Sequence, residues 1–278
     1  MVPSSIPFVA IDFRLRLSAG EIIYWGVRHQ FQPGAPSLTA LSEEIRPYAE
    51  RALFLVEGIP NLSPDRSESV RERSKALLFG MDRPTLVSEL GERGIAVDLA
   101  RTYDRPIYSP EPSEQVLAEM LLEAGYDLLQ IVGFHTLLSL SGHLSQQEQL
   151  GRQTELLEFV DECIRMFVAK LPDSLKESIP TQRPGFGLAI LQQFSPEIAW
   201  EHVTSAMILN LLTGNTEEGY DDSFIARLTK AHSQAREQFV ASAAINYLND
   251  YPLVVIVFGV SHTIGVLTHL ANRTDAIL

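Results

Sequence analysis

The chain has little cysteine and little positive charge, and each scarcity narrows what the protein can be. Its 278 residues include one cysteine, Cys163, so a disulfide within the chain and a thiolate metal cluster are excluded. The 22 basic residues are outnumbered by 35 acidic ones, which gives a formal net charge of −13. Because such a surface repels phosphate groups and anionic lipids, we expect no nucleic-acid partner and no membrane partner.

Long apolar segments and targeting signals are also missing. The most apolar run, residues 253–260, has eight residues, whereas a membrane-spanning helix needs roughly 20. Residues 1–17 lack a basic start, a sustained apolar stretch and a small-residue cleavage site, so they do not predict a signal peptide. We therefore expect a cytoplasmic protein. No GxSxG, Walker or HExxH motif assigns a reaction.

The first part of the chain alternates between strand and helix patterns. Residues 8–17 alternate in polarity as a strand does, and residues 22–25 are a short apolar strand. Apolar residues recur at helical spacing within 36–52, and residues 53–56 form another apolar strand. Strand, helix and strand within about 35 residues match one βαβ unit, whose right-handed crossover makes the two strands parallel.

The middle of the chain is helical in its periodicity. Strands are predicted on either side of it, at residues 106–109 and 253–258. We predict a single α/β domain over residues 1–278, with a mostly parallel central sheet, flanking helices and a large helical insert at about 112–220. The stretch 172–187 is rich in Pro, Ser and Gly and is predicted to be a loop.

A short sequence pattern occurs twice, once near each end of the chain. Residues 22–29 read IIYWGVRH and residues 254–262 read VVIVFGVSH, so an apolar strand runs into Gly-x-x-His in each copy. We expect each glycine to let the backbone turn sharply past the strand, placing His29 and His262 at the strands' carboxyl ends. Open parallel sheets bind ligands at that edge.

Charged residues are expected at the same edge. Glu57 directly follows the strand 53–56, and Glu111 follows the strand 106–109. Arg236 lies on the helix predicted before the last strand, where it could hold the carboxylates ionised or bind a substrate oxyanion. Structural alternatives are a helix-start acid for Glu111 and a simple salt bridge for Arg236. His232, one turn earlier, is predicted to lie on the helix surface.

The segments GVRH (26–29), VEG (56–58), AREQFVASAAINYL (235–248) and VFGVSHTIG (257–265) resemble the Tiki/TraB, erythromycin esterase and ChaN-like superfamily. The resemblance implies a hydrolase that cleaves a peptide or ester bond, with site roles for His29, Glu57, Arg236 and His262. Two further residues at this edge, Glu111 and Arg28, are predicted to bind substrate. Residues 112–220 do not align, and Phe239-Val240 stands where Tiki/TraB chains often carry methionine.

Two versions of the chemistry are compatible with these residues. In the first, His29, Glu57 and His262 bind Mn²⁺, Co²⁺ or Zn²⁺, which activates a water. In the second, His29 is the general base, Glu57 orients it, and Arg236 or His262 stabilises the oxyanion. The partner is then a small-molecule or peptide substrate.

A different class of function competes with both versions. A non-catalytic protein that binds a ligand or a metallocofactor would keep the same fold and polar cluster. The apolar faces of the middle helices are also compatible with a dimer.

Overall fold

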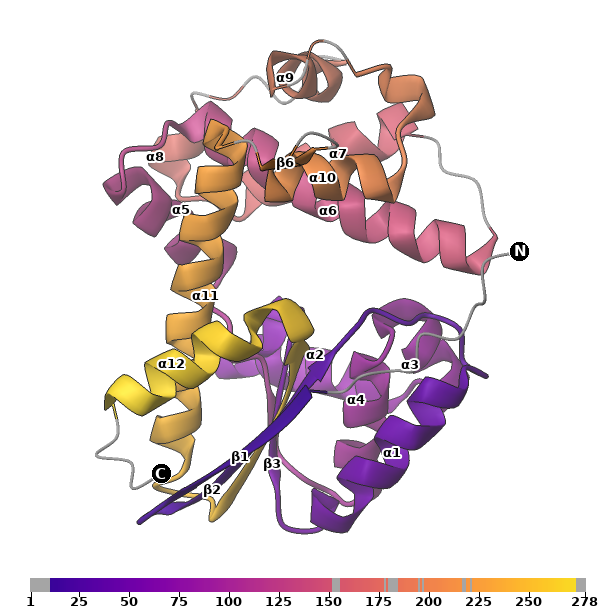
Figure 1. Ribbon diagram of the computed structural model, residues 1–278, viewed down its shortest axis with the longest axis vertical. Helices are drawn as coiled ribbons and strands as arrows, with labels where there is room; N and C mark the ends of the chain where they lie inside the picture. Colours follow the sequence, from indigo (N-terminus) through magenta and orange to yellow (C-terminus); the bar gives the residue numbers. More distant parts are fainter. Residues whose placement is uncertain are drawn as a thin grey trace. The chain divides into compact units, whose positions relative to one another are not determined.

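In the computed structural model of the protein, the described residues are 11–151, 156–177, 179, 185–194, 196, 198–216, 219–220 and 222–273. The chain divides into two compact units, whose helices and some of whose strands are labelled in Figure 1. Unit 1 comprises Met1–Ser113 and Arg236–Leu278, and unit 2 comprises Glu114–Ala235. The second boundary falls inside the long helix α11 (Phe224–Tyr247). The insert that we predicted at about 112–220 thus ends later, at Ala235.

Unit 1 contains a five-stranded sheet in the order β1-β2-β7-β3-β4 (Figure 1). The strands are β1 (Ile11–Leu17), β2 (Gly20–Val27), β3 (Leu53–Val56), β4 (Ile107–Tyr108) and β7 (Leu253–Gly259). Only β1 is antiparallel to its neighbour, and the other pairs are parallel. The predicted α/β fold with a mostly parallel sheet is therefore confirmed.

The last strand lies in the middle of the sheet. β2 and β3 run parallel, as the βαβ pattern predicted, but β7 is inserted between them. All seven residues of β7 are buried, which suits a central strand covered on both faces. The two GxxH segments, far apart in sequence, thus follow neighbouring strands.

Helices cover both faces of this sheet. One hydrophobic core joins alternate strand residues, such as Val255 and Val257, to the first helices of the unit. The other core joins Val254 and Ile256 to the unit 1 part of α11 and to α12. In Figure 1, α1 and α4 lie on one side of the sheet and α12 on the other. The helices are α1 (Pro36–Ala49), α2 (Glu68–Phe79), α3 (Arg83–Leu90), α4 (Arg93–Thr102) and α12 (Thr263–Arg273), with short 3-10 turns η1 (Pro60–Leu62) and η3 (Val260–His262).

The predicted amphipathic helix after β2 is α1. Pro36 occupies its first turn, where the fixed φ of proline suits a helix start and no backbone N–H is lost. Leu38, Leu41 and Ile45 are buried on one face, as their helical spacing predicted, and Glu44 is exposed on the other. The helix therefore forms because its apolar stripe packs against the sheet.

The described part of unit 2 is helical apart from a two-stranded ribbon, β5 (Asn215–Thr216) and β6 (Gly219–Tyr220). Its helices are α5 (Glu114–Glu123), α6 (Leu128–Leu150), α7 (Leu156–Ala169), α8 (Asp173–Lys176), α9 (Phe186–Phe194), α10 (Ser205–Thr213) and the first half of α11, with the 3-10 turn η2 (Trp200–His202). A separate hydrophobic core links them.

Gly151 adopts φ 65° and ends α6 in a left-handed cap. One prediction about unit 2 needs correction. The loop predicted at 172–187 contains α8 and the start of α9; its residues 178 and 180–184 lie outside the described residues.

His232 does not lie on the helix surface, as we predicted. It is 5% exposed and packs edge-on against Phe134 and His135, with ring centroids 5.1 and 5.4 Å away. Since α11 is covered by the aromatic core of unit 2 at this point, the surface interpretation was wrong.

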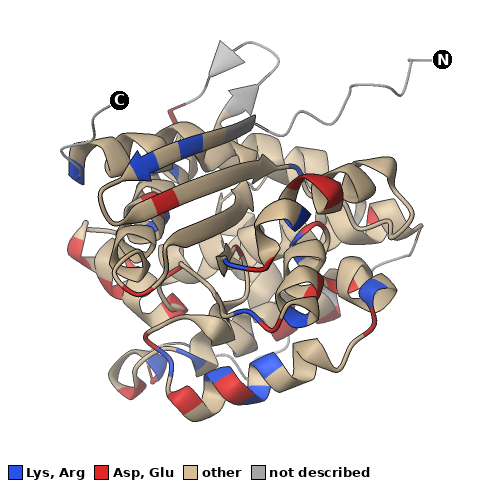
Figure 2. Ribbon diagram, turned by 90° about the horizontal axis from the view of Figure 1, so that it is seen from below, with Lys and Arg blue, Asp and Glu red and all other residues tan. Residues whose placement is uncertain are grey.

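Charged residues are dispersed over the elements. Figure 2 shows acidic and basic residues interspersed along many helices and loops. Within the described part of the chain, no helix combines the length and the apolarity needed to cross a membrane.

Candidate functional site

A polar side chain lies just past the carboxyl end of each of four strands of unit 1. His29 comes two residues after β2, and Glu57 comes directly after β3. Glu111 follows β4 by three residues, and His262 closes η3, which directly follows β7. Since these strands are parallel, all four side chains emerge at the same edge of the sheet.

Arg236 links three of these residues from its position on α11. Its Nε donates to Glu111 Oε1 at 2.6 Å, and its Nη2 donates to Glu57 Oε1 at 2.6 Å. Its Nη1 lies 3.5 Å from His262 Nε2. The Arg236 side chain is 14% exposed, so this guanidinium is a largely buried cation held between two carboxylates.

Glu57 is the buried centre of the charge distribution. Its Oε2 accepts a hydrogen bond from the Gly259 backbone N–H at 2.6 Å. Burial raises the pKa of Glu57, but the positive charge of Arg236 outweighs it, and the pKa falls to about 2. His29, His262 and Arg93 act in the same direction. Glu57 is therefore a permanent anion at neutral pH, stabilised from both ends of the chain.

The glycine of the second GxxH segment has a different role from the one predicted. Gly259 has φ −56° and ψ 134°, which any residue can adopt, so no sharp turn requires glycine there. A Cβ at Gly259 would instead lie 3.1 Å from Glu57 Oε2. Gly26, in the first segment, is an ordinary residue of β2. The turn explanation was wrong, and at Gly259 the missing side chain makes room for the carboxylate.

His29 is paired with a residue that the sequence did not suggest. Its Nδ1 lies 2.9 Å from Glu92 Oε1, while Glu92 Oε2 accepts the Gln30 backbone N–H at 3.0 Å. Glu92 is fully buried, whereas the His29 side chain is 46% exposed. The hydrogen bond with Glu92 raises the pKa of His29, and Glu57 acts on it only through its charge.

His262 is paired in the same way. Its Nδ1 lies 2.9 Å from Oε1 of Glu237, the residue after Arg236. A Cβ at Gly265 would lie 2.0 Å from Glu237 Oε2, so a larger residue there would require the Glu237 carboxylate to move from its place beside His262. The His262 side chain is 10% exposed, and its ring packs edge-on against Phe258.

A second arginine also faces Glu57. Arg93 is adjacent to Glu92 in sequence, just as Arg236 is adjacent to Glu237. The Nε of Arg93 donates to the Leu90 carbonyl at 2.7 Å. Its guanidinium lies against Gly58, which adopts φ 68°, and a Cβ there would meet Arg93 Nη1 at 2.1 Å. The site thus has two histidines, each bonded to a glutamate that adjoins an arginine.

Arg28, predicted to bind substrate, is exposed, and in the described part of the chain no hydrogen bond or ion pair links it to this cluster. Its role stays a prediction. Sequence reasoning missed Glu92, Arg93 and Glu237. Glu237 adjoins Arg236 within a motif segment and could have been found, but Glu92 is 63 residues from His29 and no spacing indicates it.

The side chains that we predicted to bind a metal make hydrogen bonds to other residues of the protein. Both Glu57 oxygens accept hydrogen bonds, and Arg236 places a positive charge between Glu57 and Glu111. Among the residues that the structure describes, no three His, Cys, Asp or Glu side chains are arranged to hold a metal ion. As placed, His29, Glu57 and His262 do not fit a shared metal, so the metal site stays a prediction without geometric support.

No protein-family model, curated protein or solved structure matches the chain. The superfamily suggested by the GxxH segments therefore stays a prediction.

Proposed function

We propose that unit 1 is a hydrolase that cleaves a peptide or ester bond, with His29 as its general base. One observation carries the proposal: a half-exposed imidazole bonded through Nδ1 to the fully buried carboxylate of Glu92. A buried carboxylate fixes the ring and its tautomer, with the proton on Nδ1 and the lone pair on Nε2. An exposed surface histidine without such support would be only a polar residue.

The chemistry follows from the positions of these side chains. His29 Nε2 removes a proton from water as the water oxygen attacks the carbonyl carbon of the substrate. The bond to the leaving nitrogen or oxygen then breaks, and the proton on Nε2 passes to the leaving group. The negative charge that develops on the carbonyl oxygen needs a cation nearby. We assign that role to Arg93, whose charge acts on both His29 and Glu57.

Arg236 and His262 take a different role in this mechanism. Arg236 is engaged with Glu57 and Glu111, and His262 is bonded to Glu237. We propose that they are positioning residues, which hold Glu57 at the edge where its charge keeps the imidazolium of His29 stable. Glu57, predicted to orient His29 directly, acts on it across space.

The test is hydrolysis of a panel of p-nitrophenyl esters and fluorogenic peptides by wild-type protein and His29→Ala. We expect turnover in the wild type and a loss of about 10²–10⁴-fold in the variant. His202→Ala, an exposed histidine of unit 2, is the matched control and should keep wild-type activity. Equal activity in all three proteins would reject His29 as the base.

The alternative of a non-catalytic binding protein is favoured by one observation. Arg236, Glu57 and Glu111 satisfy one another, and a cavity of about 360 Å³ in unit 1 includes Glu111 in its lining but neither His29 nor His262. Absence of turnover across the panel, together with ligand binding at that cavity, would support this second function.

A further inference from the structure

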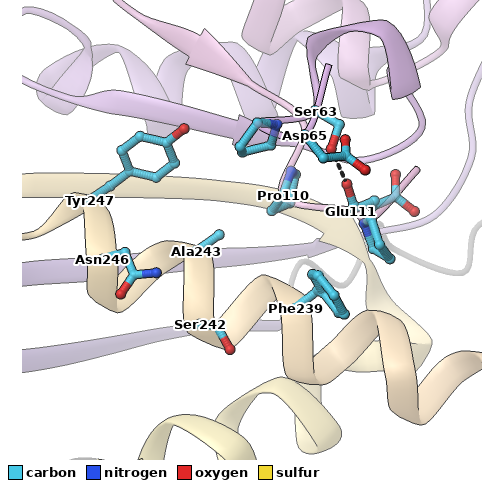
Figure 3. A pocket seen from close by; sticks show the side chains of 11 residues that line it. Ser63, Asp65, Pro110, Glu111, Phe239, Ser242, Ala243, Asn246 and Tyr247 are labelled. Carbon is cyan, nitrogen blue, oxygen red and sulfur yellow. Dashed lines mark hydrogen bonds between the residues drawn. The ribbon is translucent and has the colours of Figure 1, made fainter. Parts of the chain in front are cut away.

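The cavity beside α11 has the size of a small-molecule site. Its volume of about 360 Å³ lies within the range of roughly 300–1,000 Å³ that such sites occupy. Figure 3 shows that one wall is the unit 1 half of α11 and that the other is made by the segments after β3 and β4. The labelled residues are Phe239, Ser242, Ala243, Asn246 and Tyr247 on α11, and Ser63, Asp65, Pro110 and Glu111 opposite.

The cavity has a negative lining. Two carboxylates, Asp65 and Glu111, belong to the described residues that line it, and none of those residues is Lys or Arg. Glu111 is already neutralised by Arg236, whereas Asp65 lies at the exposed rim and accepts the Ser113 backbone N–H at 3.0 Å. Burial raises the pKa of Asp65, but hydrogen bonds from Ser113 and Ser63, together with the positive charge of Arg66, outweigh it and lower the pKa. Asp65 therefore presents a full negative charge at neutral pH.

Aromatic rings complete the lining. Phe239 and Tyr247 lie two turns apart on α11, and both contribute to the cavity. Tyr247 is stacked on Tyr108 with ring centroids 4.9 Å apart, so its orientation is fixed by packing. Aromatic faces attract organic cations and also bury apolar groups. A carboxylate at the rim with aromatic rings in the wall selects a ligand that has both a positive and an apolar part.

We propose that this cavity binds a small organic amine, with its ammonium group at Asp65 and its apolar body against Phe239 and Tyr247. The proposal goes beyond the hydrolase function and does not rest on it, because it requires neither histidine. A neutral ligand of the same shape would bring no positive charge to Asp65, and an anionic one would be repelled.

The experiment is a titration with benzylamine, followed by the NMR signals of the protein, beside benzyl alcohol as the neutral analogue of similar shape. We expect benzylamine to bind at least about tenfold more tightly than benzyl alcohol, since both can donate a hydrogen bond to the Asp65 carboxylate but only the ammonium adds a positive charge to that contact. Asp65→Asn should weaken benzylamine about tenfold. Glu44→Gln, which removes an exposed acid from α1, should leave its affinity unchanged.

A second variant tests the place of binding independently of charge. Ser242→Leu fills the cavity from α11 and should abolish benzylamine binding, with thermal melting used to check that the variant is folded. Equal affinities for the amine and the alcohol would overturn the proposed ligand class. Undiminished binding to Ser242→Leu, or no binding to the wild type, would overturn the site. Because the readout is binding, none of these results depends on whether the protein hydrolyses a substrate.

Discussion

The two GxxH histidines occupy equivalent positions but differ in their surroundings. Each follows a parallel strand and bonds through Nδ1 to a glutamate that adjoins an arginine. The His29 side chain is 46% exposed, whereas that of His262 is 10% exposed. The same local sequence thus gives one imidazole that solvent and substrate can reach and one that is part of the core. The difference shows that the residues packed around a motif, and not the motif, decide how far each imidazole is exposed to solvent.

The two arginines offer the strongest way to test this contrast. Arg236→Met leaves Glu57 and Glu111 as buried carboxylates without their cation, so we expect the free energy of unfolding to fall by about 3–5 kcal/mol. Arg93→Met, on the more exposed side, should lower it by about 1 kcal/mol. Urea unfolding of both variants at pH 7 measures the difference. Equal losses would contradict the assignment of a structural role to Arg236.

Substitutions of the two histidines should also lower the free energy of unfolding by different amounts, again with the larger loss at the buried site. His262→Ala leaves Glu237 without its imidazole partner and opens a gap next to Phe258, which should lower the free energy of unfolding by about 2–3 kcal/mol. His29→Ala should lower it by only about 1 kcal/mol, since water can enter the vacated space and solvate Glu92. Thermal melting at pH 7 provides the comparison. A greater loss of stability in His29→Ala would reverse the roles of the two pairs.

Much of this arrangement could be predicted from the sequence, because it depends on local patterns. Apolar runs located β2, β3 and β7, and the parallel-edge rule predicted that Glu57, Glu111 and His262 lie at one edge. Arg236 was added from its position on the helix before the last strand. The partners of the histidines could not be predicted in this way. Glu92 pairs with His29 across 63 residues, and only the packing of α4 against the sheet places it there. The close approach of Glu57 to Gly259 likewise depends on where the Glu57 side chain lies, which no local pattern encodes.

A glycine substitution tests the buried pair without removing either partner. Gly265 lies inside α12, where helix propensity alone predicts that alanine stabilises by about 0.5–1 kcal/mol. A Cβ at this position would instead collide with Glu237 Oε2, so we expect Gly265→Ala to destabilise the protein by about 1–2 kcal/mol. Gly142→Ala, in α6 with open space around the added carbon, is the matched control and should stabilise. If both variants stabilise, the Glu237–His262 pair does not depend on this glycine.

Acid titration tests the contribution of Glu57, the buried anion on which the charges of both His29 and His262 act. The pKa of Glu57 is lowered from 4.5 to about 2, so its stabilising contribution is complete above pH 4.5 and is lost as the pH falls toward 2. Glu57→Gln should remove this part of the pH dependence. Urea midpoints measured between pH 6 and pH 2 check the prediction. An unchanged slope in the variant would mean that other carboxylates dominate acid unfolding.

The smallest expected effect is a shift in the pH dependence of hydrolysis, and it tests the exposed His29–Glu92 pair. The hydrogen bond with Glu92 raises the pKa of His29, and a general base acts only when it is neutral, so hydrolysis should decline as the pH falls through that raised pKa. Glu92→Gln keeps the size of the partner but removes its charge. The pKa of His29 then falls, and the acid limb of the kcat/KM profile should move to lower pH, while Glu237→Gln should leave it in place. Because both variants keep the imidazole of His29, a shift confined to Glu92→Gln identifies the ring that titrates. A shift in Glu237→Gln alone would assign the chemistry to His262 and make the buried pair the catalytic one.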